Sequence, residues 1–111
     1  MVETLYDVEE FWKFMMRVGR IVEAEKVPRT KKLIKLVVDF GNETRTIITG
    51  LADQYSPEDF VGKKMIFVTN LKPKKFSGIL SEGMLLVAEE PNGKVHLITV
   101  DDSVPEGTRV Y

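Results

Sequence analysis

Apolar and polar positions alternate over most of the chain with the two-residue period of half-buried β-strands. Turn-forming residues separate the alternating segments, and the dipeptide Gly41-Asn42 is a tight connection typical of a hairpin. Gly19 lies inside the first and longest segment, where it predicts a β-bulge that bends the strand. The segments predicted to be strands are 16–27, 33–40, 43–49, 64–71, 83–89 and 94–100, followed by a terminal strand within 103–111.

A short helix is predicted before the first strand. Asp7 and Glu10 have the spacing of a capping box, in which each side chain accepts a hydrogen bond from the backbone N–H group of the other residue. The helix is expected over 8–14. Its apolar residues recur at helical spacing, and they are Val8, Phe11, Trp12 and Met15. We expect this face to be buried against the rest of the domain or against a partner subunit.

A second short helix is expected between the third and fourth strands. Ser56 can cap it, Pro57 suits its first position, two acids follow, and it should end near Gly62. The element order, with a hairpin around 91–93, is that of the OB-fold. We therefore expect a mainly all-β protein: a five-stranded Greek-key OB-fold barrel with an N-terminal helix, a short helix between strands 3 and 4, and a C-terminal hairpin extension.

Length and composition narrow the classes of protein that fit. A chain of 111 residues suits one domain, 1–111. Without Cys there is neither a disulfide framework nor a thiolate metal site. The sequence does not begin with the blocks of a signal peptide, and no apolar run approaches the roughly 20 residues that cross a bilayer. We expect a cytoplasmic protein with no membrane association, no metal and no cofactor.

The distribution of charge indicates an anionic partner although the net charge is only −1. Ten of the 16 lysines and arginines lie in two windows without any acid, 26–35 and 63–75. In the expected fold, these windows cover the loops joining strands 1–2 and 4–5, which bind oligonucleotides in OB-folds. One such cluster is often only solvated surface, but two in one small chain favour nucleic-acid binding.

The residue types in these loops are those that contact RNA. Phe76 can stack on an unpaired base or plug the space under its own loop, and both alternatives stay open. Asn70 can likewise contact RNA or cap a turn, and Ser81 supplies a hydroxyl group. Lysines bind phosphates as point charges, and the candidates are Lys31, Lys32, Lys35, Lys72, Lys74 and Lys75.

The sequence predicts no catalytic site. His96 is the only histidine, and it lies in a predicted strand without a nucleophile motif beside it. Asp101 and Asp102 precede a predicted turn, so we interpret them as capping residues. We therefore expect a binding protein and not an enzyme.

Three segments, VGRIVEAEKVP, ITGLADQYSPEDFVGKK and NLKPKKFSGILSEGMLLVA, resemble the tRNA-binding OB domain of methionyl-tRNA synthetases. In that family the domain forms either the C-terminal part of the enzyme or a free-standing β subunit. The resemblance covers about residues 7–111. Its RNA-binding motif falls on Asn70, Lys72, Ser81 and Met84, Lys32 and Lys35 add charge from the other loop, and Gly83 would be kept for backbone conformation.

This resemblance implies a non-catalytic homodimer that binds tRNA by shape, supports aminoacylation and works with a catalytic methionyl-tRNA synthetase subunit. A related branch, the CsaA-type export chaperones, shares the dimeric OB architecture and would imply binding of unfolded polypeptides. Leu71 and the run 81–84 resemble the tRNA-binding branch. We therefore favour tRNA as the partner and keep the chaperone as the alternative.

Overall fold

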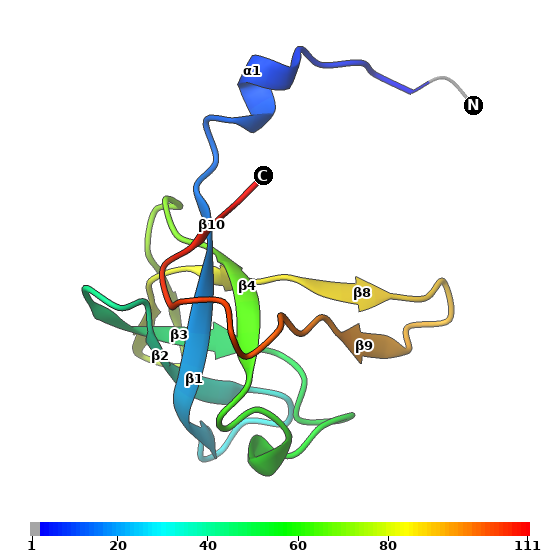
Figure 1. The fold of residues 1–111 in the computed structure, drawn as a ribbon. Coiled ribbons are helices and arrows are strands. Elements are labelled where there is room, and N and C mark those ends of the chain that lie inside the picture. The colour runs from blue at the N-terminus through cyan, green and yellow to red at the C-terminus, as the bar shows by residue number, and fades with distance from the viewer. Residues whose placement is uncertain (1–2) are drawn as a thin grey trace.

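The computed structural model describes residues 3–111 and shows a curled antiparallel sheet with a short helix standing above it (Figure 1). Five strands form the main path of the sheet in the order β3-β2-β1-β4-β7, and β10 pairs with the start of β1. The elements are α1 (Val8–Phe11), β1 (Met16–Lys26), β2 (Ile34–Asp39), β3 (Thr44–Thr49), the 3-10 helix η1 (Pro57–Asp59), β4 (Lys64–Val68), β5 (Lys74–Phe76), β6 (Ile79–Ser81), β7 (Met84–Leu85), β8 (Val87–Glu89), β9 (Val95–Leu97) and β10 (Arg109–Val110).

Hydrogen bonds close the sheet into a barrel between β3 and the connection from β6 to β7. The Glu82 N–H group donates to the Thr46 carbonyl oxygen over 2.9 Å. The Ile48 N–H group donates to Ser81 Oγ over 3.0 Å. This strand order and closure confirm the predicted OB-like barrel, including the short helix η1 between the third and fourth strands.

Alternation along β2 builds the core of the barrel. Ile34, Leu36 and Val38 are fully buried, while the residues between them face outward. Inside the barrel, the rings of Phe40 and Phe67 meet edge to face with centroids 5.6 Å apart. Each such side chain contributes about 1.5–3 kcal/mol through burial, so the core gives the functional loops a rigid base.

The β-bulge predicted at Gly19 is wrong in its position. The register shift of β1 lies between Ile21 and Glu23 instead. A Cβ atom at Gly19 would lie 2.4 Å from Val38 Cγ1 and 2.7 Å from the Phe40 ring. The glycine is therefore required because core side chains pack directly on its backbone.

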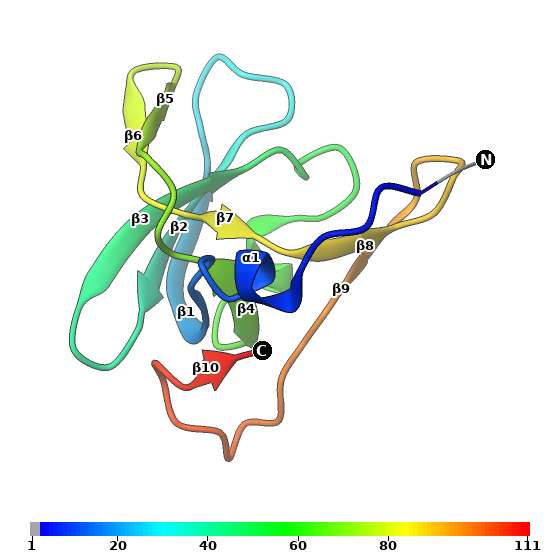
Figure 2. The same ribbon diagram turned by 90° about the horizontal axis from the view of Figure 1, so that it is seen from above.

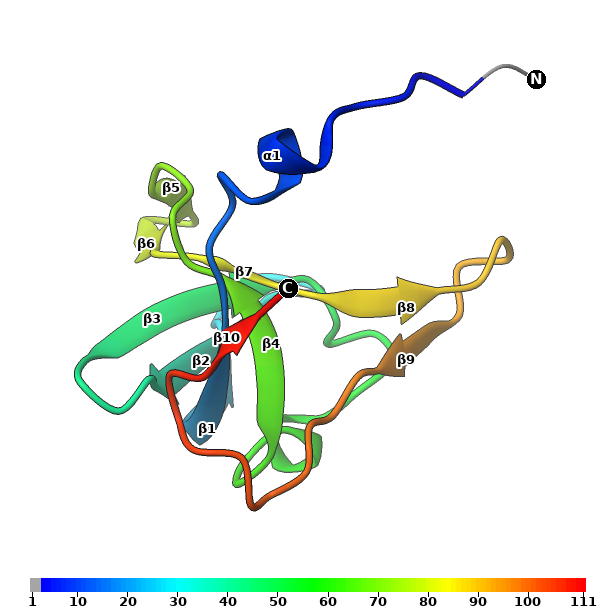
Figure 3. The same ribbon diagram turned by 45° about the horizontal axis from the view of Figure 1, so that its top comes forward.

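Helix α1 is shorter than predicted and its apolar face is not buried against the barrel. It comprises a single turn, and the Asp7 side chain makes no capping hydrogen bond. Figure 3 shows the helix standing off from the sheet. Phe11, Trp12 and Phe14 are each about half exposed. The capping-box prediction is wrong, and so is the expectation that this face is buried against the rest of the domain.

The hairpin predicted around 91–93 is present, but the strand that leads into it is interrupted. The expected strand 83–89 is split at Leu86 into β7 and β8, and β8 pairs with β9 in a hairpin that projects from the barrel (Figure 1).

Lys64, which the sequence places in a basic window, is buried. Its ammonium group donates to the carbonyl oxygens of Asp102 and Val104 and pairs with Glu106 over 2.9 Å. Lys64 thus anchors the C-terminal segment and is not a surface charge.

Among residues 3–111, no helix is long and apolar enough to cross a membrane.

Candidate nucleic-acid interface

The connection between β4 and β7, which was predicted as the loop joining strands 4 and 5, contains a short β-hairpin of its own. Strands β5 and β6 pair through a two-residue turn at Ser77 and Gly78, whose φ angles are 50° and 81°. Two consecutive positive φ angles are typical of a type I′ turn, whose twist matches the flanking strands. Because side chains alternate along β5, Lys74 and Phe76 share one face and Lys75 points to the other.

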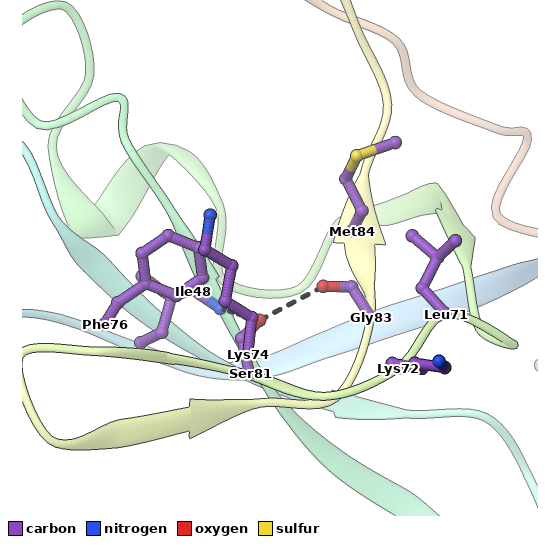
Figure 4. A pocket seen from close by; sticks show the side chains of 8 residues that line it. All are labelled: Ile48, Leu71, Lys72, Lys74, Phe76, Ser81, Gly83 and Met84. Atoms are coloured by element: carbon purple, nitrogen blue, oxygen red, sulfur yellow. Dashed lines mark hydrogen bonds between the residues drawn. The ribbon is translucent and has the colours of Figure 1, made fainter.

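A pocket of about 260 Å³ lies between this hairpin and the barrel. Figure 4 shows two walls facing each other across a floor formed by Ser81 and Gly83. The first wall consists of Ile48, Lys74 and Phe76, and the second of Leu71, Lys72 and Met84. The pocket therefore brings together five of the ten candidate residues, namely Lys72, Lys74, Phe76, Ser81 and Met84.

At the floor of the pocket, the Ser81 hydroxyl already has hydrogen-bond partners within the protein. Ser81 is buried, and its hydroxyl accepts a bond from the Ile48 N–H group and donates to the Gly83 carbonyl oxygen over 3.1 Å. Gly83 has a φ of 155°, and a Cβ there would lie 3.0 Å from the Val68 carbonyl oxygen. Both residues shape the pocket, and the Ser81 hydroxyl has no donor left for a ligand.

Phe76 and Asn70, whose roles the sequence left open, occupy different surroundings. Phe76 is half-buried and lines the pocket, with the Lys74 ammonium 5.2 Å from its ring centroid. Asn70 instead holds the segment before β1: its Oδ1 accepts from the Met15 N–H group over 2.6 Å, and its Nδ2 donates to the Lys13 carbonyl oxygen over 2.7 Å. The Asn70 amide is thus used by the protein itself.

The candidate lysines differ in their neighbours. Lys32 lies 3.9 Å from an Asp53 carboxylate oxygen, and Lys35 lies 3.7 Å from one of Glu25. The windows that contain no acid in sequence are therefore partly neutralised in space by other elements. Within the described chain, four exposed candidates form no ion pair, namely Lys31, Lys72, Lys74 and Lys75. In Figure 2, the 27–33 loop and the hairpin project toward the same side of the barrel.

An arginine that the sequence analysis did not single out fixes both ends of the segment that forms the hairpin. Arg45 Nη1 donates to the carbonyl oxygens of Thr69, over 2.5 Å, and Glu82, over 3.1 Å. Glu43 orients it by accepting from Arg45 Nε over 2.7 Å and from Arg17 over 3.0 Å. These hydrogen bonds from Arg45 and then Arg17 lower the pKa of Glu43 below its ordinary value. Strand pairing is needed to reveal this network, because Arg17, Thr69 and Glu82 are all far in sequence from Glu43 and Arg45.

The residues weighed for catalysis lie away from the pocket. His96 pairs with Glu90 over 2.5 Å on the exposed β8–β9 hairpin. Asp101 accepts hydrogen bonds from the N–H and hydroxyl groups of Ser103, as expected of a turn cap. Across residues 3–111, no group of three or more acidic or histidine side chains is placed to hold a metal.

The chain matches known proteins over nearly all of its length. A family model described as putative tRNA binding domain matches residues 16–109. The methionine–tRNA ligase of Methanocaldococcus jannaschii is 51% identical over 104 residues, which are 94% of this chain and 16% of that protein. This chain thus spans about one-sixth of the length of the curated relatives it matches.

Two solved structures share the fold closely. A MetRS-related protein from Pyrococcus horikoshii is 65% identical, with a TM-score of 0.97 over 98% of this chain and 100% of that one. The chaperone CsaA of Bacillus anthracis is 28% identical, with a TM-score of 0.86 over 97% of this chain and 100% of that one.

Proposed function

The chain belongs to the putative tRNA-binding domain family, and we propose that it is a non-catalytic module that binds tRNA through the β5–β6 hairpin and the neighbouring pocket. The observation that carries this proposal is a set of exposed lysines that form no ion pair within residues 3–111, namely Lys72, Lys74 and Lys75, on the segment that Arg45 holds at both ends. Unpaired ammonium groups attract phosphates, because no internal ion pair has to be broken first.

The relatives suggest the setting in which this binding is used. The matched region is a small part of methionine–tRNA ligases. We propose that the chain acts as a β-subunit-like partner of a catalytic methionyl-tRNA synthetase in the cytoplasm, where it raises the local affinity for tRNA. The lysines supply charge and the hairpin supplies shape, so little base sequence needs to be read.

The exposed face of α1 supports a homodimer. An apolar groove of about 440 Å³ is lined by Tyr6, Phe11 and Phe14, with Glu10, and Trp12, which follows Phe11 in sequence, is half exposed. Large apolar patches on the surface of soluble proteins commonly mark sites where another protein binds. Two copies joined here would present two hairpins to a single tRNA.

A gel-shift titration with folded tRNA, unfolded tRNA and a plain RNA duplex at two salt concentrations tests the tRNA proposal. We expect tighter binding of folded tRNA and a steep loss of affinity as salt increases. Equal affinity for the three RNAs, or none, would contradict a tRNA-binding function.

The export-chaperone function is a second candidate, because CsaA shares the fold at 28% identity and the α1 groove could bind an apolar peptide. A competition experiment measures whether a reduced, unfolded polypeptide displaces bound tRNA, which it does only if both ligands use the same surface. Suppression of aggregation at stoichiometric amounts, without any tRNA binding, would favour the chaperone.

A further inference from the structure

We propose that the pocket beneath the β5–β6 hairpin receives one unpaired nucleobase of the bound RNA. The inference rests on the proposed tRNA-binding function and deepens it, because it names a feature of the RNA that shape and charge alone would not require. A base held in this pocket must be unstacked from its neighbours, as in a loop, a bulge or a single-stranded end.

The two walls of the pocket suit a flat apolar group. Phe76 and Ile48 form one wall, and Leu71 and Met84 face them across the floor (Figure 4). Every nucleobase has a π-face that stacks on an aromatic ring whatever its sequence. The methionine thioether adapts to an adjacent ring edge, so the second wall fits purines and pyrimidines alike.

The size of the pocket favours a single base over a longer ligand. Its volume of about 260 Å³ lies below the range of about 300–1,000 Å³ typical of pockets that enclose drug-sized molecules. The floor offers no free hydrogen-bond donor from Ser81. We therefore expect a stacked base with weak sequence preference, since donors and acceptors that would read its edge are mostly absent from the walls.

The charge at the rim distinguishes a nucleotide from an apolar peptide side chain. Lys72 and Lys74 line the pocket, and neither forms an ion pair with another described residue. No carboxylate lines the pocket. A base that enters carries a phosphate on each side, and these phosphates meet the two ammonium groups. A neutral apolar side chain would leave both charges without a partner.

The test uses a blunt-ended RNA duplex without a loop that carries one bulged 2-aminopurine (the bulged stem), and the same duplex with that base paired to uracil (the paired stem). Wild type is compared with Leu71→Ala and Met84→Ala. Both side chains are exposed enough, at 36% and 47%, for the barrel to tolerate truncation. Leu80→Ala is the matched control, because Leu80 is 45% exposed on the same hairpin but does not line the pocket. Thermal melts verify folding.

We expect wild type to bind the bulged stem about 5- to 150-fold more tightly than the paired stem, the range for one stacked base. The fluorescence of 2-aminopurine should change on binding. Leu71→Ala and Met84→Ala should lose most of this preference at an unchanged salt dependence, while Leu80→Ala keeps it. Equal affinity of wild type for both stems, or a preference that survives both pocket variants, would overturn the inference.

The result for folded tRNA separates this inference from the proposed function. If wild type binds tRNA tightly but does not distinguish the two stems, the base pocket fails and the tRNA-binding function stands. If wild type prefers the bulged stem through Leu71 and Met84 but does not bind folded tRNA, the pocket stands and the proposed function fails.

Discussion

At the scale of single residues, the structure ranks lysines that the sequence treated alike. Lys32 and Lys35 each face a carboxylate from another element, whereas Lys72 and Lys75 face none among residues 3–111. Lys64 is removed from the set altogether by its anchoring role. Residue type and loop position could be predicted from sequence, but these ion pairs could not, because their acids come from segments brought close only by strand pairing.

This ranking predicts the salt dependence of RNA binding. Lys72→Ala and Lys75→Ala should each flatten the slope of log affinity against log salt by roughly 0.7–0.9, the contribution of one neutralised phosphate. Lys32→Ala should flatten it less, since Asp53 already offsets part of that charge. Filter binding over a series of salt concentrations measures the slopes, with Lys94→Ala on the β8–β9 turn as the control. Slopes identical to wild type would remove these lysines from the interface.

The lowered pKa of Glu43 makes the free energy of unfolding depend on pH in the acidic range. Its pKa in the folded protein lies below the ordinary value of 4.5, because Arg45 and Arg17 stabilise the charged form. The stabilisation by Glu43 is therefore present above about pH 4.5 and is lost as the pH falls through the lower folded pKa. Urea unfolding at several pH values should show a smaller loss of stability in acid for Glu43→Gln than for wild type. Parallel curves for the two proteins would contradict this account.

At the scale of elements, the sequence predicted the barrel better than the site. The long apolar segments were sufficient to predict β1 to β4, and burial alternates cleanly along β2. The three-residue strands β5 and β6 were missed because Pro73 and Gly78 mark turns, and a hairpin this short carries little periodic signal. Ile48 was missed as a wall of the pocket because it lies on β3, outside the basic loops.

The hairpin turn gives a prediction about shape. Gly78→Val places a β-branched residue at a φ of 81°, which costs about 1–2 kcal/mol and should distort the hairpin. We expect RNA affinity to fall about tenfold and the melting temperature to fall by roughly 4–8 °C per kcal/mol of this cost, so affinity is measured well below the unfolding transition. Ser77→Asn is the matched control, since asparagine tolerates the positive φ of that position. Unchanged affinity in Gly78→Val would show that hairpin geometry is unimportant.

At the scale of the whole molecule, the C-terminal strand β10 contacts the segment that follows α1. Arg109 Nη2 donates to the Trp12 carbonyl oxygen over 3.1 Å, so β10 supports the residue that follows α1 (Figures 1 and 3). Two apolar segments could form a dimer contact: the terminal strand, with Val104 and Val110, and the helix with the residues that follow it. Exposure favours the helix segment, because Val104 and Val110 are half-buried, whereas Phe11 of α1 and the following Trp12 and Phe14 are about half exposed.

If two chains assemble through this face, the mass of the protein in solution should be that of a dimer. Sedimentation equilibrium should give twice the chain mass of 12.7 kDa for wild type and the single mass for the double variant Phe11→Ser, Phe14→Ser. Val61→Ser alters a comparably exposed apolar residue beyond η1 and should leave the dimer intact. A monomeric wild type, or a dimer that persists in the double variant, would contradict the proposed contact.

Because Trp12 lies on this face, its intrinsic fluorescence can report on self-association. It is the only tryptophan of the chain and its side chain is half exposed. An indole that leaves an apolar contact for water emits at longer wavelength, so diluting an unlabelled sample through its dissociation constant should shift the emission to the red. The strength of self-association can then be followed in real time, without attaching any dye.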